Sequence, residues 1–295
     1  MPEVTSLAAD ARERDVRAAL HSDPRTSALA EAPLTVQPGG LSNHAWVADG
    51  GSEKFFVRLS PPEAVRLGVD RASECRLLGI VAHAGLAPEV IRCDPALRLL
   101  VTRHIEGYTL ARDEATLPLN VERVGSALRR LHALPVPAGM RRVDFAAQAK
   151  HLEAQCVVST PVSRQLRTDA HAAFGALSAA SRRATLCHND LHHLNLVDGG
   201  DRLWLVDWEY GGTGDPAFDI ASFVCQHDCG QREREMLLEA HGDGLPAQQL
   251  QAACWAFDYV QWLWYRAWPA GGGADTVYGE RAADLERRLR TEDPV

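Results

Sequence analysis

Lysine is nearly absent from this chain of 295 residues, because only Lys54 and Lys150 of its 31 basic residues are lysines. Acidic residues outnumber the basic ones, and the formal net charge is -8. A nucleic-acid-binding protein needs a positively charged surface to replace the counterions of the phosphate backbone. The composition therefore argues against a nucleic-acid partner and favours a small neutral or cationic one.

The chain also lacks a long uninterrupted apolar run. The N-terminal residues MPEVTSLAADARERD contain acids and arginines but no apolar segment of a secretory signal, so we expect no leader peptide. The most apolar stretch, ACWAFDYVQWLWYRAW at 253–268, is interrupted by Asp258, Gln261 and Arg266. It is too polar to cross a bilayer, and it predicts a buried helix in a protein without a membrane partner.

The seven cysteines are an odd number without regular spacing. Disulfide-rich scaffolds have paired cysteines at recurring intervals, so this pattern predicts reduced thiols and a cytoplasmic protein. The segment CQHDC at 225–229 contains possible zinc ligands. Because no second Cys or His pair lies at a structural-zinc interval, we interpret it as a helical face with incidental thiols.

The order of predicted elements indicates an α+β fold with two lobes. Residues 34–59 alternate apolar runs with glycine turns, which predicts a small antiparallel sheet. A long helix is expected over 61–88, followed by strands at 89–91 and 97–105. Helices dominate from residue 119, where Val121, Val124, Leu128 and Leu131 share one helical face. We place the N-terminal lobe at 1–105, with 1–30 as a helical or poorly ordered extension, and the C-terminal lobe at 106–295.

Residues 187–210 contain the strongest chemical signal. The run CHNDLHHLNL at 187–196 is followed by LVDWEY at 205–210, and the apolar runs between them flank DGGD, a hairpin signal. With the turn centred on Gly199 and Gly200, Asn195 lies opposite about residue 204, and Asp207 opposite about residue 192. The open end of the hairpin then gathers Asp190, Asn195 and Asp207. Converging carboxylates need a cation between them, and Mg²⁺ prefers such oxygen ligands.

Asp190, Asn195 and Asp207 follow the order of the base and metal ligands in phosphoryl-transfer enzymes. The segments CHNDLHHLNLV, LVDWEY and GDPAFDIASF closely resemble the choline, ethanolamine and thiamine kinase branch of the aminoglycoside phosphotransferase-like superfamily. That superfamily shares the two-lobed protein-kinase fold, and the resemblance covers most of the chain in order. It implies a nucleotide loop at GGLSN (39–43), a third strand at FFVRL, a lobe-bridging helix at ASECRLL and a hinge at LLVTRHIEGYTL.

The resemblance implies a role for each matching residue. Asp190 would be the catalytic base, Asn195 and Asp207 the magnesium ligands, and His188 and Asp219 braces of the catalytic loop. The implied ATP-binding residues are Gly39, Gly40, Ser42, Asn43, Arg58, Glu74, Thr102, His104 and Ile105, with Glu74 paired to Arg58. The sequence departs from the pattern in three places. Arg58 stands where many relatives have lysine, GGLSN lacks a three-glycine loop, and LHHLN leaves the role of His192 and His193 open.

The substrate is less clearly indicated than the reaction. Trp255, Tyr259 and Trp262 share one helical face, which is typical of a core stripe. The alternative is an aromatic wall that holds a cation, helped by Asp258 or Glu209. We expect transfer of the γ-phosphoryl group of ATP, with Mg²⁺, to choline or a related amino alcohol. Thiamine is the first alternative. An aminoglycoside and a nucleotide-binding pseudokinase are less favoured.

Overall fold

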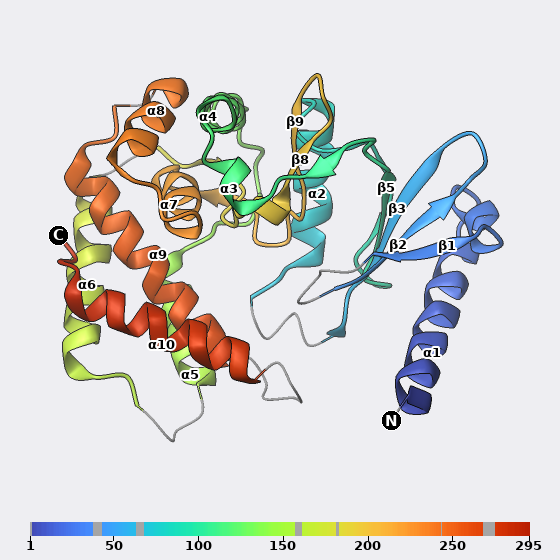
Figure 1. Ribbon diagram of the computed structural model, residues 1–295, viewed down its shortest axis with the longest axis horizontal. Coiled ribbons are helices and arrows are strands. Elements are labelled where there is room, and N and C mark those ends of the chain that lie inside the picture. Colours follow the sequence, from blue (N-terminus) through green and yellow to red (C-terminus); the bar gives the residue numbers. More distant parts are fainter. Residues whose placement is uncertain are drawn as a thin grey trace. The chain divides into compact units, whose positions relative to one another are not determined.

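The computed structural model describes residues 2–37, 43–62, 68–156, 161–180, 183–242, 244–267 and 275–295 (Figure 1). The chain divides into two compact units, Met1–Tyr108 and Thr109–Val295. The first unit contains an antiparallel sheet, and the second is mainly helical. The predicted α+β fold class is therefore confirmed.

The first unit is built on a five-stranded antiparallel sheet in the order β1-β2-β3-β5-β4. Its strands are β1 (Leu34–Gln37), β2 (His44–Asp49), β3 (Lys54–Leu59), β4 (Val90–Asp94) and β5 (Leu99–Arg103). Gly51 has a φ of 88° in the turn between β2 and β3, a backbone conformation that glycine adopts without strain. Trp46, Val57 and Val101 turn toward helix α1 (Pro2–His21) and the short helix η1 (Ser27–Ala30), and form one core with them.

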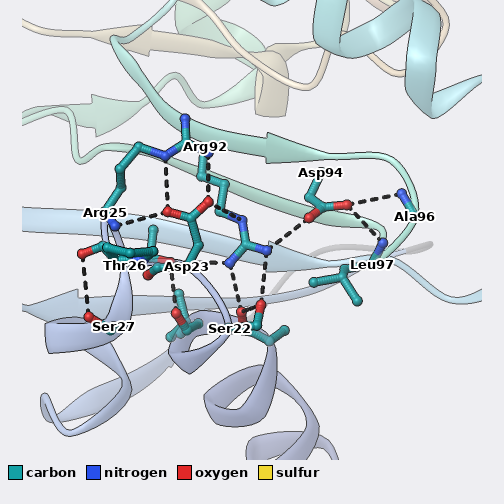
Figure 2. A network of polar contacts seen from close by, with 12 residues as sticks. Ser22, Asp23, Arg25, Thr26, Ser27, Arg92, Asp94, Ala96 and Leu97 are labelled. Atoms are coloured by element: carbon teal, nitrogen blue, oxygen red, sulfur yellow. Dashed lines mark hydrogen bonds and ion pairs between the residues drawn. The ribbon is translucent and has the colours of Figure 1, made fainter.

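Arg92 fastens the end of α1 to this sheet (Figure 2). Its side chain is only 4% exposed, and it donates hydrogen bonds to the carbonyl of Ala19 at 2.7 Å and to Ser22 Oγ at 3.0 Å. A further bond of 2.8 Å reaches the Asp94 carboxylate on the same strand. The carbonyls of a helix C-terminus lack intrahelical partners and favour a cation. This contact explains why the N-terminal extension is a docked helix.

Helix α2 (Arg71–His83) begins later than the sequence predicts, because the Asp70 side chain caps it by accepting a hydrogen bond from the Ser73 N–H. Part of the expected helix, residues 63–67, lies outside the described residues. Cys75 of α2 forms a disulfide with Cys93 of β4, with their Cα atoms 5.5 Å apart. The prediction of reduced thiols is wrong for this pair. The number and spacing of the cysteines do not reveal that α2 packs against β4. The other five cysteines are free thiols.

We expect the disulfide to stabilise the first unit. It links residues 18 apart in sequence. Closing a loop of about that length lowers the conformational entropy of the unfolded chain, which stabilises the folded state by roughly 3 kcal/mol. The variant C75S/C93S should lose about this much unfolding free energy in denaturant titrations without reductant. Dithiothreitol should bring the native protein down to the variant, whereas Cys156→Ser should change nothing. Equal stabilities of C75S/C93S and the native protein without reductant would contradict a formed disulfide.

The second unit consists mainly of helices, and α9 (Ala247–Ala267) packs among them (Figure 1). Four helices pack against α9, namely α5 (Phe145–Gln155), α6 (Arg164–Ala179), α7 (Ala217–Gln226) and α10 (Asp275–Thr291). The predicted burial of α9 is confirmed. Among the described residues, no helix is both long enough and apolar enough to cross a membrane. The other described α-helices of this unit are α3 (Arg112–Ala115), α4 (Pro118–His132) and α8 (Gln231–His241).

Short strands carry the polar segments of this unit. They are β7 (Thr185–Cys187), β8 (Leu196–Asp198), β9 (Leu203–Leu205) and β10 (Gly212–Gly214), with a single helical turn, η3 (His193–Asn195), before β8. Strand β7 pairs with β10, and β8 with β9. Strand β6 (Tyr108–Thr109) falls at the unit boundary. Residues 188–192 therefore form a loop between β7 and η3, which we call the catalytic loop after the role that the kinase resemblance implies.

Candidate active site

The catalytic loop is held by side chains of α7. The Asp219 carboxylate is fully buried and accepts hydrogen bonds from the backbone N–H of His188 at 3.0 Å and of Asn189 at 2.5 Å. Ser222, one helical turn further along, accepts the N–H of Leu191 at 2.7 Å. These bonds hold Asn189 at a φ of 68°, a left-handed conformation that asparagine tolerates better than most non-glycine residues. Asp219 thus lies where a brace of the loop is required.

His188 ties the same loop to the following hairpin. Its Nε2 lies 2.8 Å from the carbonyl oxygen of Val206, and its ring packs against Trp208. The ring is fully buried, and burial lowers the pKa of His188 although neighbouring carboxylates oppose that effect. A neutral imidazole donating to a carbonyl fits a structural brace.

The hairpin register differs from the predicted one by two residues. Leu196 pairs with Leu205 and Asp198 with Leu203, so Asn195 lies opposite Val206, whose N–H donates to the Asn195 carbonyl at 3.0 Å. The turn is longer than a two-glycine loop, because Asp198 Oδ1 accepts the N–H of Gly200 and Gly199 bonds to Arg202. In this register Asp207 directly follows Val206, the residue that pairs with Asn195.

Asp190 is 18% exposed, and its Oδ2 lies 3.6 Å from His192 Nε2. Burial disfavours its charged form, but His192, His188 and Asn195 outweigh burial and lower the pKa of Asp190. Burial works to lower the pKa of His192, but the carboxylates of Asp190 and Asp207 outweigh burial and raise it. Asp190 is therefore an ionised carboxylate that water can reach, as a proton acceptor requires.

The residues around Asp190 suit a hard divalent cation. Asn195 Nδ2 donates to the carbonyl of Asp190 at 2.8 Å, so the amide Oδ1 is the Asn195 atom that could bind a cation. Asp207 has a φ of 61°, so its backbone is held in a conformation that an acidic residue tolerates better than most. Carboxylate and amide oxygens are the ligands that Mg²⁺ prefers. The donor set thus fits magnesium, and it contains no soft ligand.

In the first unit, Glu74 joins two arginines. Its Oε1 lies 2.6 Å from Arg58 Nη2 of β3, and its Oε2 lies 2.7 Å from Arg71 Nη1, three residues earlier on α2. Arg71 also donates to Asn43 Oδ1 at 3.2 Å. Burial works against the Glu74 charge, but the two guanidinium groups lower the pKa of Glu74. The resemblance to the kinases implied the pair Arg58–Glu74, whereas Arg71 was missed although its spacing of three on a helix is a usual ion-pair signal.

The other expected nucleotide-binding residues lie on or near β5 or outside the described residues. Thr102 is buried on β5, opposite Phe56 of β3, and the backbone N–H of His104 donates to the carbonyl oxygen of Lys54. Ile105 is half-buried just beyond that strand. Gly39, Gly40 and Ser42 lie outside the described residues.

The tryptophan stripe of α9 lies in the core. Trp255 and Trp262 are each 1% exposed. The indole N–H of Trp255 donates to the carbonyl oxygen of Leu289 of α10, and the guanidinium of Arg266 lies over the ring of Trp262. Asp258 is bound by Arg288 at 2.8 Å. This placement corresponds to the core alternative for these tryptophans.

A different aromatic group lies beside the catalytic loop, and sequence reasoning missed it. The indole N–H of Trp264 donates to the Tyr210 hydroxyl at 3.0 Å, and the Tyr210 carbonyl accepts a hydrogen bond from Asn189 at 3.0 Å. Trp264 also packs edge-on against Tyr265 and Tyr278. Burial raises the pKa of Tyr210 well above 10, and the buried Glu209 and the Asp190 carboxylate add to this rise. We call Tyr210, Trp264, Tyr265 and Tyr278 the aromatic cluster.

Three features are together typical of kinase-like phosphotransferases. They are the braced loop, the side-chain oxygens of Asn195 and Asp207, and a sheet unit with a buried arginine–glutamate pair. Residues 34–263 match the family described as Phosphotransferase enzyme family, APH. The chain belongs to this family.

Individual relatives point in the same direction. The chain is 28% identical over 212 residues to protein LicA of Haemophilus influenzae, and this match covers 69% of the chain and 61% of that relative. A choline/ethanolamine kinase family protein from Mesorhizobium loti is 25% identical, with a TM-score of 0.76 over 95% of this chain and 96% of that one. Choline kinase LicA from Streptococcus pneumoniae is 19% identical, with a TM-score of 0.79 over 95% and 99% of the two chains. The last likeness describes the fold alone.

Proposed function

We propose that this protein transfers the γ-phosphoryl group of ATP to the hydroxyl of a small cationic alcohol, choline or a related amino alcohol. The observation that carries the proposal is the ionised, accessible Asp190 on a braced loop, with Asn195 bonded to it and Asp207 one residue beyond the strand partner of Asn195. Membership of the phosphotransferase family supports the reaction type.

In this proposal each side chain has a separate task. Asp190 accepts a hydrogen bond from the substrate hydroxyl, orients it and takes its proton, and its lowered pKa keeps it ionised at neutral pH. Asn195 and Asp207 would hold magnesium, which supplies charge neutralisation at the phosphates when bound. Arg58, oriented by Glu74, would contact a phosphate through its planar fork. Asp219 and His188 keep the loop in place, so positioning and electrostatics supply most of the rate enhancement.

The aromatic cluster supports a cationic substrate. Ring faces attract a quaternary ammonium group, and a nearby carboxylate strengthens that attraction. Tyr210 and Trp264 are linked to the catalytic loop through Asn189, and Glu209 adjoins Tyr210 in sequence. A cation held there would place its hydroxyl chain toward Asp190. Arg281, whose guanidinium lies 5.9 Å from the ring centroid of Tyr265, would favour a singly charged ligand over a polycationic aminoglycoside.

The substrate is tested by measuring ADP release with magnesium and ATP against choline, ethanolamine, thiamine and kanamycin. We expect the highest kcat/KM with choline or ethanolamine. If thiamine alone were phosphorylated, thiamine would become the proposed substrate in place of the amino alcohol. ATP binding without turnover of any of the four would favour the pseudokinase and contradict the proposal. Asp201→Asn, an exposed substitution in the hairpin turn, is the control for handling losses.

Trp264→Leu should raise the KM for the amino alcohol by roughly 5- to 30-fold, the size of a partly desolvated cation-π contact. The KM for ATP should stay within about twofold, because Trp264 is bonded to Tyr210 and packs against Tyr265, and neither residue is assigned to the nucleotide. Trp204→Leu, which removes a ring stacked under Arg202 on the hairpin, is the matched control. An unchanged KM for the alcohol would remove Trp264 from the substrate site.

A further inference from the structure

Two histidines lie behind the catalytic loop, one at the C-terminal end of each of two helices. His132 is the last residue of α4 and His241 the last residue of α8. His132 Nδ1 lies 2.8 Å from His241 Nε2, and His132 Nε2 lies 2.9 Å from Asp219 Oδ2. The side chains of His132 and Asp219 are 6% and 0% exposed, and His241 is 5% exposed. Three helices thus meet in one buried chain of polar groups that ends on the brace of the loop.

Close packing of α4 and α8 makes this chain possible. A Cβ atom at Gly125 would lie 2.7 Å from the Cβ of Ala240 and 2.8 Å from the carbonyl oxygen of Leu237. Gly125 is two helical turns before His132 and therefore lies on the same face of α4. The absent side chain lets the helix axes approach until the two imidazoles are within hydrogen-bonding distance.

The hydrogen-bonding capacity of Asp219 determines the direction of the chain. His132 supports its ionised form: burial opposes the charge, but the bond to His132 comes first among the effects that lower the pKa of Asp219. An ionised carboxylate only accepts, so His132 Nε2 carries the proton and donates to Oδ2. In a neutral His132 ring, Nδ1 is then an acceptor, and His241 Nε2–H must donate to it. Oδ1 of Asp219 remains turned to the backbone N–H groups of His188 and Asn189.

We propose that His132 and His241 are positioning residues for phosphoryl transfer. They orient the Asp219 carboxylate, which holds Asn189 in its left-handed conformation and so places Asp190. The inference rests on the proposed function for its kinetic consequences, but its structural consequence for the loop does not. No part of it requires either histidine to contact the substrate.

A metal ion is the competing explanation for the same atoms. Ligand atoms of His132, Cys187 and Asp219 lie within 4.8 Å of one another. Burial, with the Asp219 charge adding to it, raises the pKa of the Cys187 thiol well above 9, and a metal would need the thiolate. The Asp219 oxygens already accept bonds from His132 and two backbone N–H groups. Hydrogen bonding therefore accounts for the group without an ion.

The test compares His132→Leu, which removes the donor, with His132→Gln, whose amide can still donate to Asp219. His241→Leu removes the second member, and the exposed His171 provides the control His171→Leu. We expect H132L to lower kcat on the order of 10- to 100-fold, the effect of misplacing a catalytic group by about 1 Å. The KM for ATP should change less than about threefold. H132Q should recover most of the kcat, and H132L/H241L should be no slower than H132L, because both act through Asp219.

Hydrogen exchange supplies a readout that needs no turnover. Amides in the peptide covering residues 186–192 should exchange faster in H132L and H241L than in the native protein. In H171L their exchange rates should equal the native ones. Faster exchange in a protein without kinase activity would support the inference while the proposed function fails. If H132L does not fold, H132Q and H241L carry the comparison. Two results would overturn the inference. One is a folded H132L whose amide exchange matches that of the native protein and whose kcat is within twofold of the native value. The other is stoichiometric zinc in the native protein that H132L lacks.

Discussion

Asp190→Asn is expected to reduce kcat by roughly a thousandfold, within the range of 10²–10⁴ typical of general acid–base catalysis. The amide has the size of the carboxylate but cannot accept the proton of the substrate hydroxyl, and it loses the attraction of His192. The dissociation constant of ATP should remain within a fewfold of the native value because the donors assigned to magnesium, Asn195 Oδ1 and Asp207, are unchanged.

Steady-state rates with the best substrate and calorimetric titration of ATP would measure both quantities. Asp201→Asn makes the same chemical change at an exposed position and should leave kcat unaltered. Full turnover by Asp190→Asn would show that Asp190 is not the base. A parallel loss of ATP binding would show that this carboxylate binds the nucleotide complex instead.

Asp207→Asn is expected to act on magnesium-dependent nucleotide binding. Loss of the charged ligand should weaken ATP binding in the presence of magnesium by roughly tenfold or more, as even indirect disturbance of a metal site does. ATP binding measured in EDTA should be equal in the two proteins. Asparagine is the better choice than alanine because Asp207 has a φ of 61°, where asparagine is tolerated and alanine adds strain.

The measurement is a titration of a fluorescent ATP analogue at fixed and at zero magnesium. Asp198→Asn is a useful second variant, because Asp198 lies on the same hairpin but is bound by Arg123 at 2.7 Å. It should affect stability and leave the magnesium dependence unchanged. The assignment of Asp207 as a metal ligand would fail if Asp207→Asn bound the nucleotide as tightly as the native protein does, both with and without magnesium.

Local patterns predicted much of the fold because they depend on neighbouring residues. The strands at 34–59 and the buried α9 follow directly from apolar spacing and turn residues. The hairpin register was off by two because the Asp198 side chain accepts the Gly200 N–H and lengthens the turn. The Asp190, Asn195 and Asp207 assignment came from their order along the chain, and it stays a prediction that the two substitutions above test.

The remaining features depend on contacts between distant residues. His132 and His241 are 109 residues apart, and nothing local in either helix predicts the other. The Cys75–Cys93 disulfide likewise follows from helix–strand packing. Trp264 shares its helix with the core tryptophans, and periodicity alone cannot show which face of such a helix reaches Tyr210. Only the three-dimensional arrangement separates structural aromatics from candidate ligand-binding ones.

The docking of α1 by Arg92 limits how far this protein can be trimmed for crystallisation or expression. Removing residues 2–30 would take away the carbonyl of Ala19 and the hydroxyls of Ser22 and Thr26, leaving a buried guanidinium short of acceptors (Figure 2). It would also uncover Trp46 and Val57, which now pack against Val16 and Leu20. A shortened chain would present a bare apolar sheet face, a surface prone to aggregation.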